Sequence, residues 1–193
     1  RWDDLKMVFE KVSEIGTMFD SDGLDIRFMN SSVSGDSINS PAKLNDLLSK
    51  VRPGGLTPTG GQLDHKILSN YRDYVKTSAP MSDKKPLLVV TITDGEPSEP
   101  RTKLKEVILN MQKSLDAAHY PKTSVAYMIA QAGTDAGAEA FLQELDEDKQ
   151  VGTSIDCVSN YEAEQAQYLK LGIDLTPELY LVKLMVGAID STY

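Results

Sequence analysis

The sequence predicts an α/β fold, in which a three-layer, doubly wound, mostly parallel sheet is flanked by helices. The uncharged run at 87–93 is the first observation, because an unbroken apolar run rich in β-branched residues is typical of a central parallel strand. Strand-like and helix-like segments alternate along most of the chain, which predicts parallel strands joined by right-handed crossovers. The 193 residues fit one domain, 1–193.

The first forty residues predict a helix, a strand and a loop. Apolar residues recur at helical spacing from Trp2 to Phe19, and Asp22-Gly23 ends that helix. Residues 24–29 alternate between apolar and polar, which predicts a strand with one wetter face. Residues 30–40 are rich in Ser, Asn, Gly and Asp, and we expect a surface loop there.

A glycine-rich turn separates the next two predicted helices. Ser40-Pro41 is typical of a helix start, and the helix that follows turns four apolar residues inward, namely Leu44, Leu47, Leu48 and Val51. The turn is 52–61, with the sequence Arg-Pro-Gly-Gly-Leu-Thr-Pro-Thr-Gly-Gly. An amphipathic helix comes next and has an apolar face made of Leu63, Ile67, Leu68, Tyr71 and Val75.

The second half of the chain continues the alternation. After the strand at 87–93, Ser98-Glu99-Pro100 predicts the start of a helix with one apolar stripe. We then expect a strand at 123–130, a helix at 136–145 and a shorter strand at 154–158. Thr176-Pro177-Glu178 predicts the start of a last helix, whose apolar face consists of Leu181, Leu184, Met185, Ala188 and Ile189.

Composition narrows the function classes. The formal charge of −9 argues against a nucleic-acid partner, because phosphate binding needs a concentrated basic face. No apolar stretch approaches the length of a membrane span. Cys157 is the only cysteine, which favours a reducing, cytoplasmic or other intracellular compartment. With His65 and His119 as the only histidines, a zinc site of the common His/Cys kind is not expected.

Two oxygen-bearing segments are candidates for chemistry. Asp94 follows the strand at 87–93, and ligands of open α/β sheets bind outside the carboxyl ends of the strands. Thr57 and Thr59 offer hydroxyls on the glycine-rich turn, so the two segments are a plausible partial shell for Mg²⁺. Taken singly, each has a plainer explanation. Asp94 is then a turn residue, and the 52–61 turn is a helix cap or a phosphate-binding loop.

Together, the glycine-rich turn and the strand that leads into Asp94 form a more specific pattern than either does alone. A Gly-Gly-x-Thr-Pro-Thr-Gly turn, a helix, and an apolar strand closing in Thr-Asp-Gly-Glu resemble the von Willebrand factor type A (VWA) domain. The resemblance implies a Rossmann-like fold and a metal-ion-dependent adhesion site for Mg²⁺, or Mn²⁺ or Ca²⁺. It assigns Thr57 and Asp94 as the metal residues, with Thr59 as the second choice for the hydroxyl. It implies a non-catalytic function, in which an acidic side chain of a protein partner completes the coordination.

One departure from the family pattern concerns its main ligands. The family takes them from an Asp-x-Ser-x-Ser loop that ends the first strand, just before the first helix. The string at 36–40, Asp-Ser-Ile-Asn-Ser, is the nearest here and has the wrong spacing. Without that strand the family's sheet would contain a slot of about 9–10 Å with unpaired amides on both walls. We therefore expect a VWA-like domain truncated at its N-terminal strand, with further residues before Arg1 in the natural protein.

Two alternatives have different functions. The first is a Mg²⁺-dependent α/β hydrolase or other phosphoryl-handling enzyme, in which Asp94 is a nucleophile or metal ligand and the glycine-rich turn holds phosphate. Against it, no His or Lys is placed by the sequence at a strand's carboxyl end, and nucleotide-binding signatures are absent. The second is a metal-free scaffold domain of the same fold. The presence of both Thr57 and Asp94 argues against that.

Overall fold

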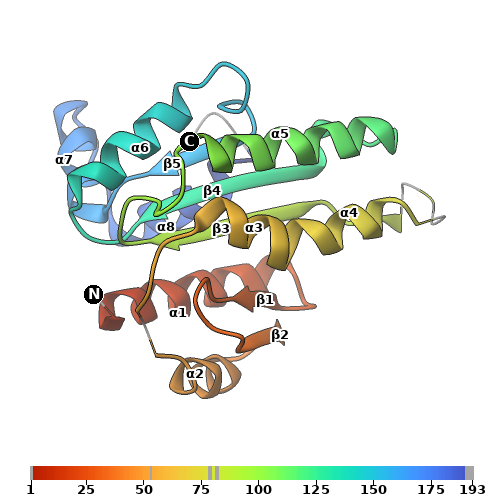
Figure 1. The fold of residues 1–193 in the computed structure, drawn as a ribbon. Coiled ribbons are helices and arrows are strands. Elements are labelled where there is room, and N and C mark those ends of the chain that lie inside the picture. Colours follow the sequence, from red (N-terminus) through yellow and green to blue (C-terminus); the bar gives the residue numbers. More distant parts are fainter. Residues whose placement is uncertain (1, 53, 78–79, 81–82, 190–193) are drawn as a thin grey trace.

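A computed structural model describes residues 2–52, 54–77, 80 and 83–189. It confirms the predicted mixed α/β architecture at a coarse level, with a three-stranded parallel sheet flanked by helices (Figure 1). In chain order the elements are α1 (Trp2–Phe19), β1 (Leu24–Arg27), β2 (Ser34–Ile38), α2 (Pro41–Ser49), α3 (Thr59–Leu63), the π-helical turn η1 (Asp64–Leu68), α4 (Ser69–Val75), β3 (Leu87–Thr93), α5 (Thr102–Ala117), the 3-10 turn η3 (Lys122–Ser124), β4 (Val125–Gln131), α6 (Ala136–Asp146), β5 (Ile155–Val158), α7 (Tyr161–Lys170) and α8 (Pro177–Val186).

The strands form two separate sheets. β3, β4 and β5 are parallel, in that order, and β3 pairs with β4 along its whole length, from Leu87 opposite Val125 to Thr93 opposite Gln131. β1 and β2 form an antiparallel pair of their own. Among the described residues, β1 is not paired with β3.

The parallel sheet has an apolar core on each face, because successive side chains of a strand point to opposite faces. On one face, Val125 and Tyr127 of β4 pack with side chains of α4, α5 and α6. On the other face, Met128 and Ala130 of β4 pack with Val12 of α1 and with α8. β4 is therefore the central strand of a three-layer arrangement, which Figure 1 shows with α5 on the near side.

A smaller core joins the two-stranded sheet to the rest of the molecule. Ile26 of β1 and Ile38 of β2 are buried against three leucines of α2, namely Leu44, Leu47 and Leu48. Phe9 of α1 and Leu24 of β1 pack against this cluster as well, and Leu24 also contacts the cluster around Val12. Helix α1 therefore belongs to both cores, and it lies between β3 and the β1–β2 pair in Figure 1.

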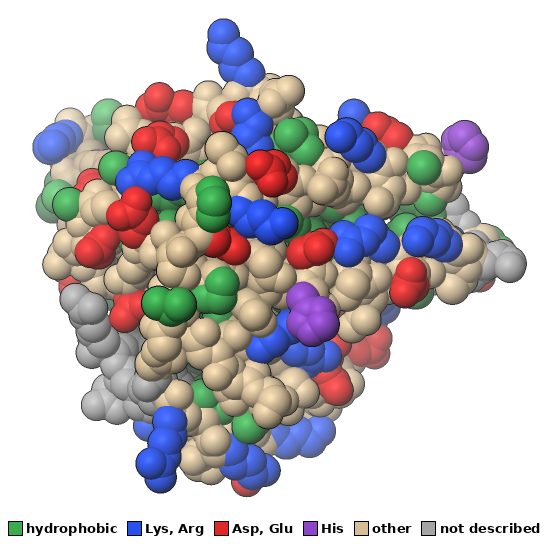
Figure 2. Space-filling model, in the orientation of Figure 1, with side chains coloured by type: hydrophobic (Ala, Val, Ile, Leu, Met, Phe, Trp, Pro, Cys, Tyr) green, Lys and Arg blue, Asp and Glu red, His purple; other side chains and the backbone are tan. Residues whose placement is uncertain are grey.

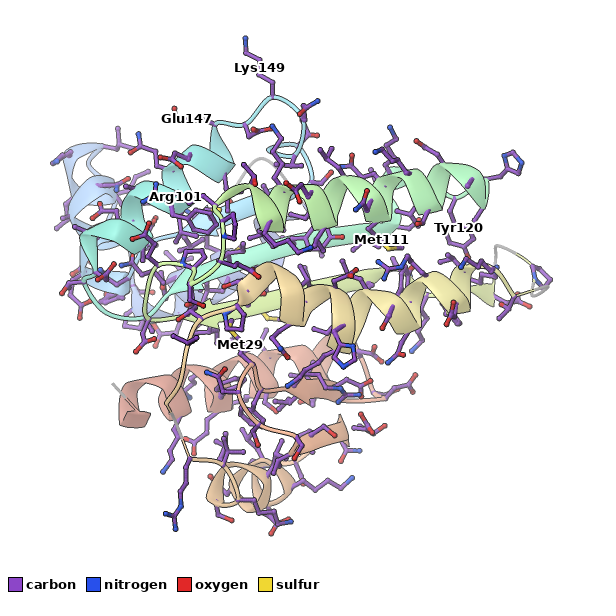
Figure 3. All side chains as sticks on the ribbon, in the orientation of Figure 1. Met29, Arg101, Met111, Tyr120, Glu147 and Lys149 are labelled. Carbon is purple, nitrogen blue, oxygen red and sulfur yellow. The ribbon has the colours of Figure 1, made fainter. Side chains whose placement is uncertain are left out.

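Lys66 of η1 also links the two sheets, by hydrogen bonds from its ammonium group. Nζ donates to the carbonyl of Phe28, to that of Met29 at 3.2 Å and to that of Ser31 at 2.9 Å. These carbonyls follow the end of β1, while η1 covers one face of the parallel sheet. The three bonds therefore hold the segment after β1, where Figure 3 labels Met29, against the helix layer above it.

The prediction of a surface loop at 30–40 is wrong, because residues 34–38 form the strand β2. The segment is polar in sequence, yet two of its residues face the α2 cluster. A Cβ on Gly35 would lie 2.6 Å from Leu47 Cδ2, so glycine allows the strand to approach the helix, and Ile38 is buried. The N–H of Ser37 donates to Asp25 Oδ1 at 3.0 Å. These partners are distant in sequence, so local composition did not reveal the strand.

Helix α7 was not predicted, and its sequence explains why. Its buried residue is an acid, Glu164, which accepts hydrogen bonds from Lys183 Nζ at 2.8 Å and from the N–H of Ser159 at 3.0 Å. The helix therefore lacks the apolar stripe that marks the others. Two smaller differences concern α5, which starts at Thr102, and Ile189, which was expected inside and is 66% exposed.

The surface has mixed charge. On the face shown in Figure 2, lysine and arginine side chains alternate with aspartate and glutamate side chains, and no extended basic area is visible. Within the described part of the chain, no helix combines the length and the apolar character needed to cross a bilayer.

The Lys66 link leads to a stability prediction. Lys66→Met removes three charge-assisted hydrogen bonds but keeps most of the apolar stem, so the free energy of unfolding should fall by about 1–3 kcal/mol. The measurement is equilibrium urea denaturation. The control is Lys76→Met, because Lys76 is exposed and only 3.6 Å from Asp73, a pair worth about 0.5 kcal/mol or less. Equal losses in the two variants would contradict the role given to Lys66.

Candidate metal site

Three loops meet at the carboxyl edge of the parallel sheet. Residues 94–101 connect β3 to α5, residues 132–135 connect β4 to α6, and the glycine-rich turn leads into α3. The first two loops begin directly after the last pair of the β3–β4 ladder, Thr93 opposite Gln131. There the N–H of Ala132 donates to the carbonyl of Thr93 at 2.7 Å. The ladder thus fixes the first two loops side by side.

The turn that carries Thr57 lies against the loop that carries Asp94. The N–H of Ser98 donates to the carbonyl of Thr57 at 3.0 Å. A Cβ placed on Gly95, the residue after Asp94, would lie 4.0 Å from Thr57 Oγ1. Asp94 is exposed and Thr57 is half-buried. The structure therefore brings the two predicted segments together at one edge.

Thr59, the second choice for the hydroxyl, has a different environment. It is buried, with 4% of its surface exposed, and it is the first residue of α3. Its Oγ1 donates to the carbonyl of Thr57 at 3.5 Å, so the hydroxyl is directed back at the turn. Of the two threonines, Thr57 is the one with access to solvent beside Asp94.

Glu99 is a residue of this edge that sequence reasoning missed. Helix α3 has Pro58 at its N-cap, which supplies no capping side chain. Instead Glu99 Oε1 accepts the N–H of Gly60 and, at 3.2 Å, the N–H of Gly61. Negative charge at a helix N-terminus is favourable, because the first amides are unpaired and the helix dipole is positive there. The carboxylate therefore fastens the β3–α5 loop to α3.

Glycine is required at position 60 for this contact. A Cβ on Gly60 would lie 2.9 Å from Glu99 Oε1 and 2.9 Å from the backbone of Leu104 in α5. The starts of α3 and α5 therefore touch almost backbone to backbone. The threonine–glycine pattern of the turn is explained in part by this close approach, and its amides are occupied by a carboxylate of the chain itself.

The remaining acids of the edge are held by an arginine and a helix start. Arg101 donates from Nε to Glu96 Oε1 at 2.8 Å and from Nη1 to Glu144 Oε1 at 2.8 Å, and these bonds raise the pKa of its guanidinium. Figure 3 labels Arg101 where α5 begins, at the opposite end of that helix from Tyr120. Asp135 caps α6 by accepting the N–H of Ala138 at 2.8 Å.

A buried amide lies beneath these loops. Gln131 is 3% exposed at the end of β4, and its Nε2 donates to the carbonyl of Asp135 at 2.8 Å. Its Oε1 is buried without a hydrogen-bond partner among the described residues. Thr93, opposite Gln131 in the ladder, donates from Oγ1 to the carbonyl of Gly95 at 3.2 Å. Polar side chains of two strands thus support the loops from below.

The donors at this edge suit a hard cation in their chemistry and supply only part of a coordination shell. Within the described ranges, no group of three or more His, Cys, Asp or Glu side chains is arranged to hold an ion. Thr57 and Asp94 offer a hydroxyl and a carboxylate, and Mg²⁺ commonly uses one or two carboxylates together with several waters. The buried, unpartnered Gln131 Oε1 is one more oxygen near the loops.

The two other residue types considered from sequence lie away from this edge. His65 is exposed on η1. Cys157 is half-buried on β5, where burial raises the pKa of its thiol.

Comparisons of the chain with protein-family models, with curated proteins and with solved structures found no match.

Glu99 can be tested as the cap of α3. Glu99→Ala leaves the amides of Gly60 and Gly61 without their acceptor, and the free energy of unfolding should fall by about 1–2 kcal/mol. Glu99→Gln keeps an oxygen acceptor without the charge and should lose about half as much. Urea denaturation measures both. Glu106→Ala, an exposed change on α5, should stay within about 0.5 kcal/mol of wild type, and a similarly small effect at Glu99 would rule out the capping role.

Proposed function

We propose that this chain is a metal-dependent protein-interaction module with the Rossmann-like arrangement of a VWA domain. Thr57 and Asp94 hold a divalent cation, Mg²⁺ or alternatively Mn²⁺ or Ca²⁺, at the carboxyl edge of the sheet. The partner is a protein that offers a carboxylate to the cation. The module catalyses no reaction, and its role is recognition.

The contact between the two loops carries this proposal. Thr57 and Asp94 are 37 positions apart in the printed sequence, and the Ser98–Thr57 hydrogen bond of 3.0 Å joins their loops. Ligands of α/β sheets gather at this kind of edge. The position of Asp94 directly after the seven-residue, uncharged strand β3, and of Thr57 beside Gly95, supports the pair as metal donors.

The two donors have separate tasks under this proposal. The Asp94 carboxylate supplies negative charge against the cation, and the Thr57 hydroxyl supplies a neutral oxygen from the neighbouring loop. Water and the partner's carboxylate fill the other positions, because the preferred shell of Mg²⁺ is octahedral. A module with few charged donors of its own leaves the cation electropositive, so an acidic side chain of a partner gains from binding it.

Glu99 weighs against the phosphoryl-handling alternative. A phosphate held by the glycine-rich turn would need the N–H groups at the start of α3. Those of Gly60 and Gly61 already donate to the Glu99 carboxylate. A phosphate would have to displace an anion that is tied to the same chain, so recognition through a metal is the better-supported function.

Metal linkage provides the test. A ligand that binds only the folded state at about ten times its Kd adds about 1.4 kcal/mol of stability. For a Kd of about 1 mM, about 10 mM Mg²⁺ should therefore raise the Tm of the 193-residue chain by about 3–6 °C relative to EDTA. Asp94→Asn should abolish this shift, and Thr57→Val should reduce it.

The control distinguishes Mg²⁺ binding at the proposed site from general electrostatic screening of the acidic surface. Asp73→Asn removes one exposed carboxylate on α4, whose side chain is 82% exposed, and should leave the Mg²⁺ shift unchanged. NaCl at the same ionic strength should not reproduce the shift, because it supplies screening without a cation that binds the site. A wild-type chain without a Mg²⁺-specific shift, or an equal shift in Asp94→Asn, would refute the proposed site.

A further inference from the structure

Strand β5 carries a carboxyl group on the face of the sheet that α8 covers. Asp156 lies opposite Met128 in the β4–β5 ladder, and Val158 follows two positions later on the same face. Met128 and Val158 belong to the apolar core that contains Leu184 of α8. Asp156 is half-buried, and its Oδ2 is buried without a hydrogen-bond partner among the described residues. An ionisable group of the sheet is therefore directed at a mainly apolar helix.

The end of α8 leaves room for this carboxyl group. A Cβ placed on Gly187, the C-cap of α8, would lie 2.1 Å from Asp156 Oδ2 and 2.9 Å from the carbonyl oxygen of Lys183. Oδ2 therefore lies close to the carbonyls at the C-terminus of the helix. These carbonyls carry partial negative charge, so they repel an ionised carboxylate. A protonated carboxyl group can instead donate to a carbonyl oxygen.

Lys183, the lysine that faces Asp156, is held by another acid. Its Nζ donates to Glu164 Oε2 at 2.8 Å, and the two side chains of this pair are 15% and 6% exposed. Nζ also lies 5.2 Å from the centre of the Tyr168 ring. Asp146, the last residue of α6, adds a further negative charge. Among the described groups that act on Asp156 from α6, α7 and α8, acids therefore outnumber the lysine.

These surroundings favour the protonated form of Asp156. Burial raises the pKa of its carboxyl group, Lys183 opposes the rise, and the charges of Asp146 and Glu164 add to it. The folded chain therefore holds a proton at Asp156 at pH values where the unfolded chain has released it. The stability that this proton provides is complete below the pKa of the unfolded aspartate. It is lost as the pH rises through the pKa of the folded chain.

We propose that Asp156 is a pH-sensitive latch for the C-terminal end of α8. When it is protonated, its carboxyl group packs against Gly187 and donates to a carbonyl at the end of the helix, so that α8 is closed on β5. When it is ionised, it is repelled by the helix end and competes with Glu164 for Lys183, and the last turn of α8 loosens. The latch lies on β5, at the opposite edge of the parallel sheet from β3, and does not depend on the metal site.

The titration of the carboxyl group itself is the first test. The carbon-13 shift of the Asp156 carboxyl carbon is followed by NMR against pH, in the folded 193-residue chain and in the same chain unfolded in urea. The midpoint should be higher in the folded chain. Glu164→Gln frees Lys183 to pair with Asp156, so the folded midpoint should fall in that variant. Equal midpoints in the folded and unfolded chains would overturn the proposal.

Asp156→Asn tests the consequence for stability. The amide keeps the shape of the carboxyl group and cannot ionise, so the unfolding constant of wild type divided by that of the variant should rise with pH. The rise should be about tenfold for each unit that separates the folded and unfolded midpoints, measured by urea denaturation. Asp73→Asn is the matched change, because the Asp73 side chain is 82% exposed, and its ratio should stay constant within about twofold. A constant ratio for Asp156→Asn as well would contradict the latch.

Hydrogen exchange read by NMR shows whether the effect is local to α8. The N–H of Gly187 donates to the carbonyl of Lys183 at 2.8 Å, so its protection reports on the last turn of the helix. After correction for the intrinsic exchange rate, this protection should fall by about tenfold from low to high pH relative to that of Met111, which is buried in the other core. In Asp156→Asn the two amides should keep a constant ratio. Equal losses at Gly187 and Met111 in wild type, or no loss at either, would refute a latch on α8.

Discussion

The seven-residue pairing of β3 with β4 is the constraint on which the rest of the structure depends. It runs from Leu87 opposite Val125 to Thr93 opposite Gln131, with an apolar core packed on each of its two faces. Because parallel strands end at the same edge, the ladder places the loops after β3 and β4 together. The hydrogen bond from Ser98 to Thr57, and the one that Glu99 accepts from Gly60, can form only because α3 starts beside that same edge. The candidate site is a consequence of strand register.

Charges at this edge are arranged so that most acids serve the fold. Glu99 binds the amides of α3, Asp135 caps α6, and Glu96 shares Arg101 with Glu144. Each of these carboxylates therefore has a structural partner, which fixes the three loops relative to one another. Thr57 and Asp94 add a hydroxyl and a carboxylate, one from each of two loops that a hydrogen bond joins. Such a pair of donors suits a cation that keeps most of its water.

The sequence was most informative where the determinants are local. Ser40 and Thr176 cap α2 and α8 as expected, because a cap depends on residues three positions away. β2 was missed because its partners are Asp25 and the leucines of α2, and α7 because its buried residue is an acid paired across the chain. Thr57 and Asp94 were predicted from a motif, whereas the Glu99 contact spans 38 or 39 positions and has no local signal. Long-range pairing is what the sequence did not specify.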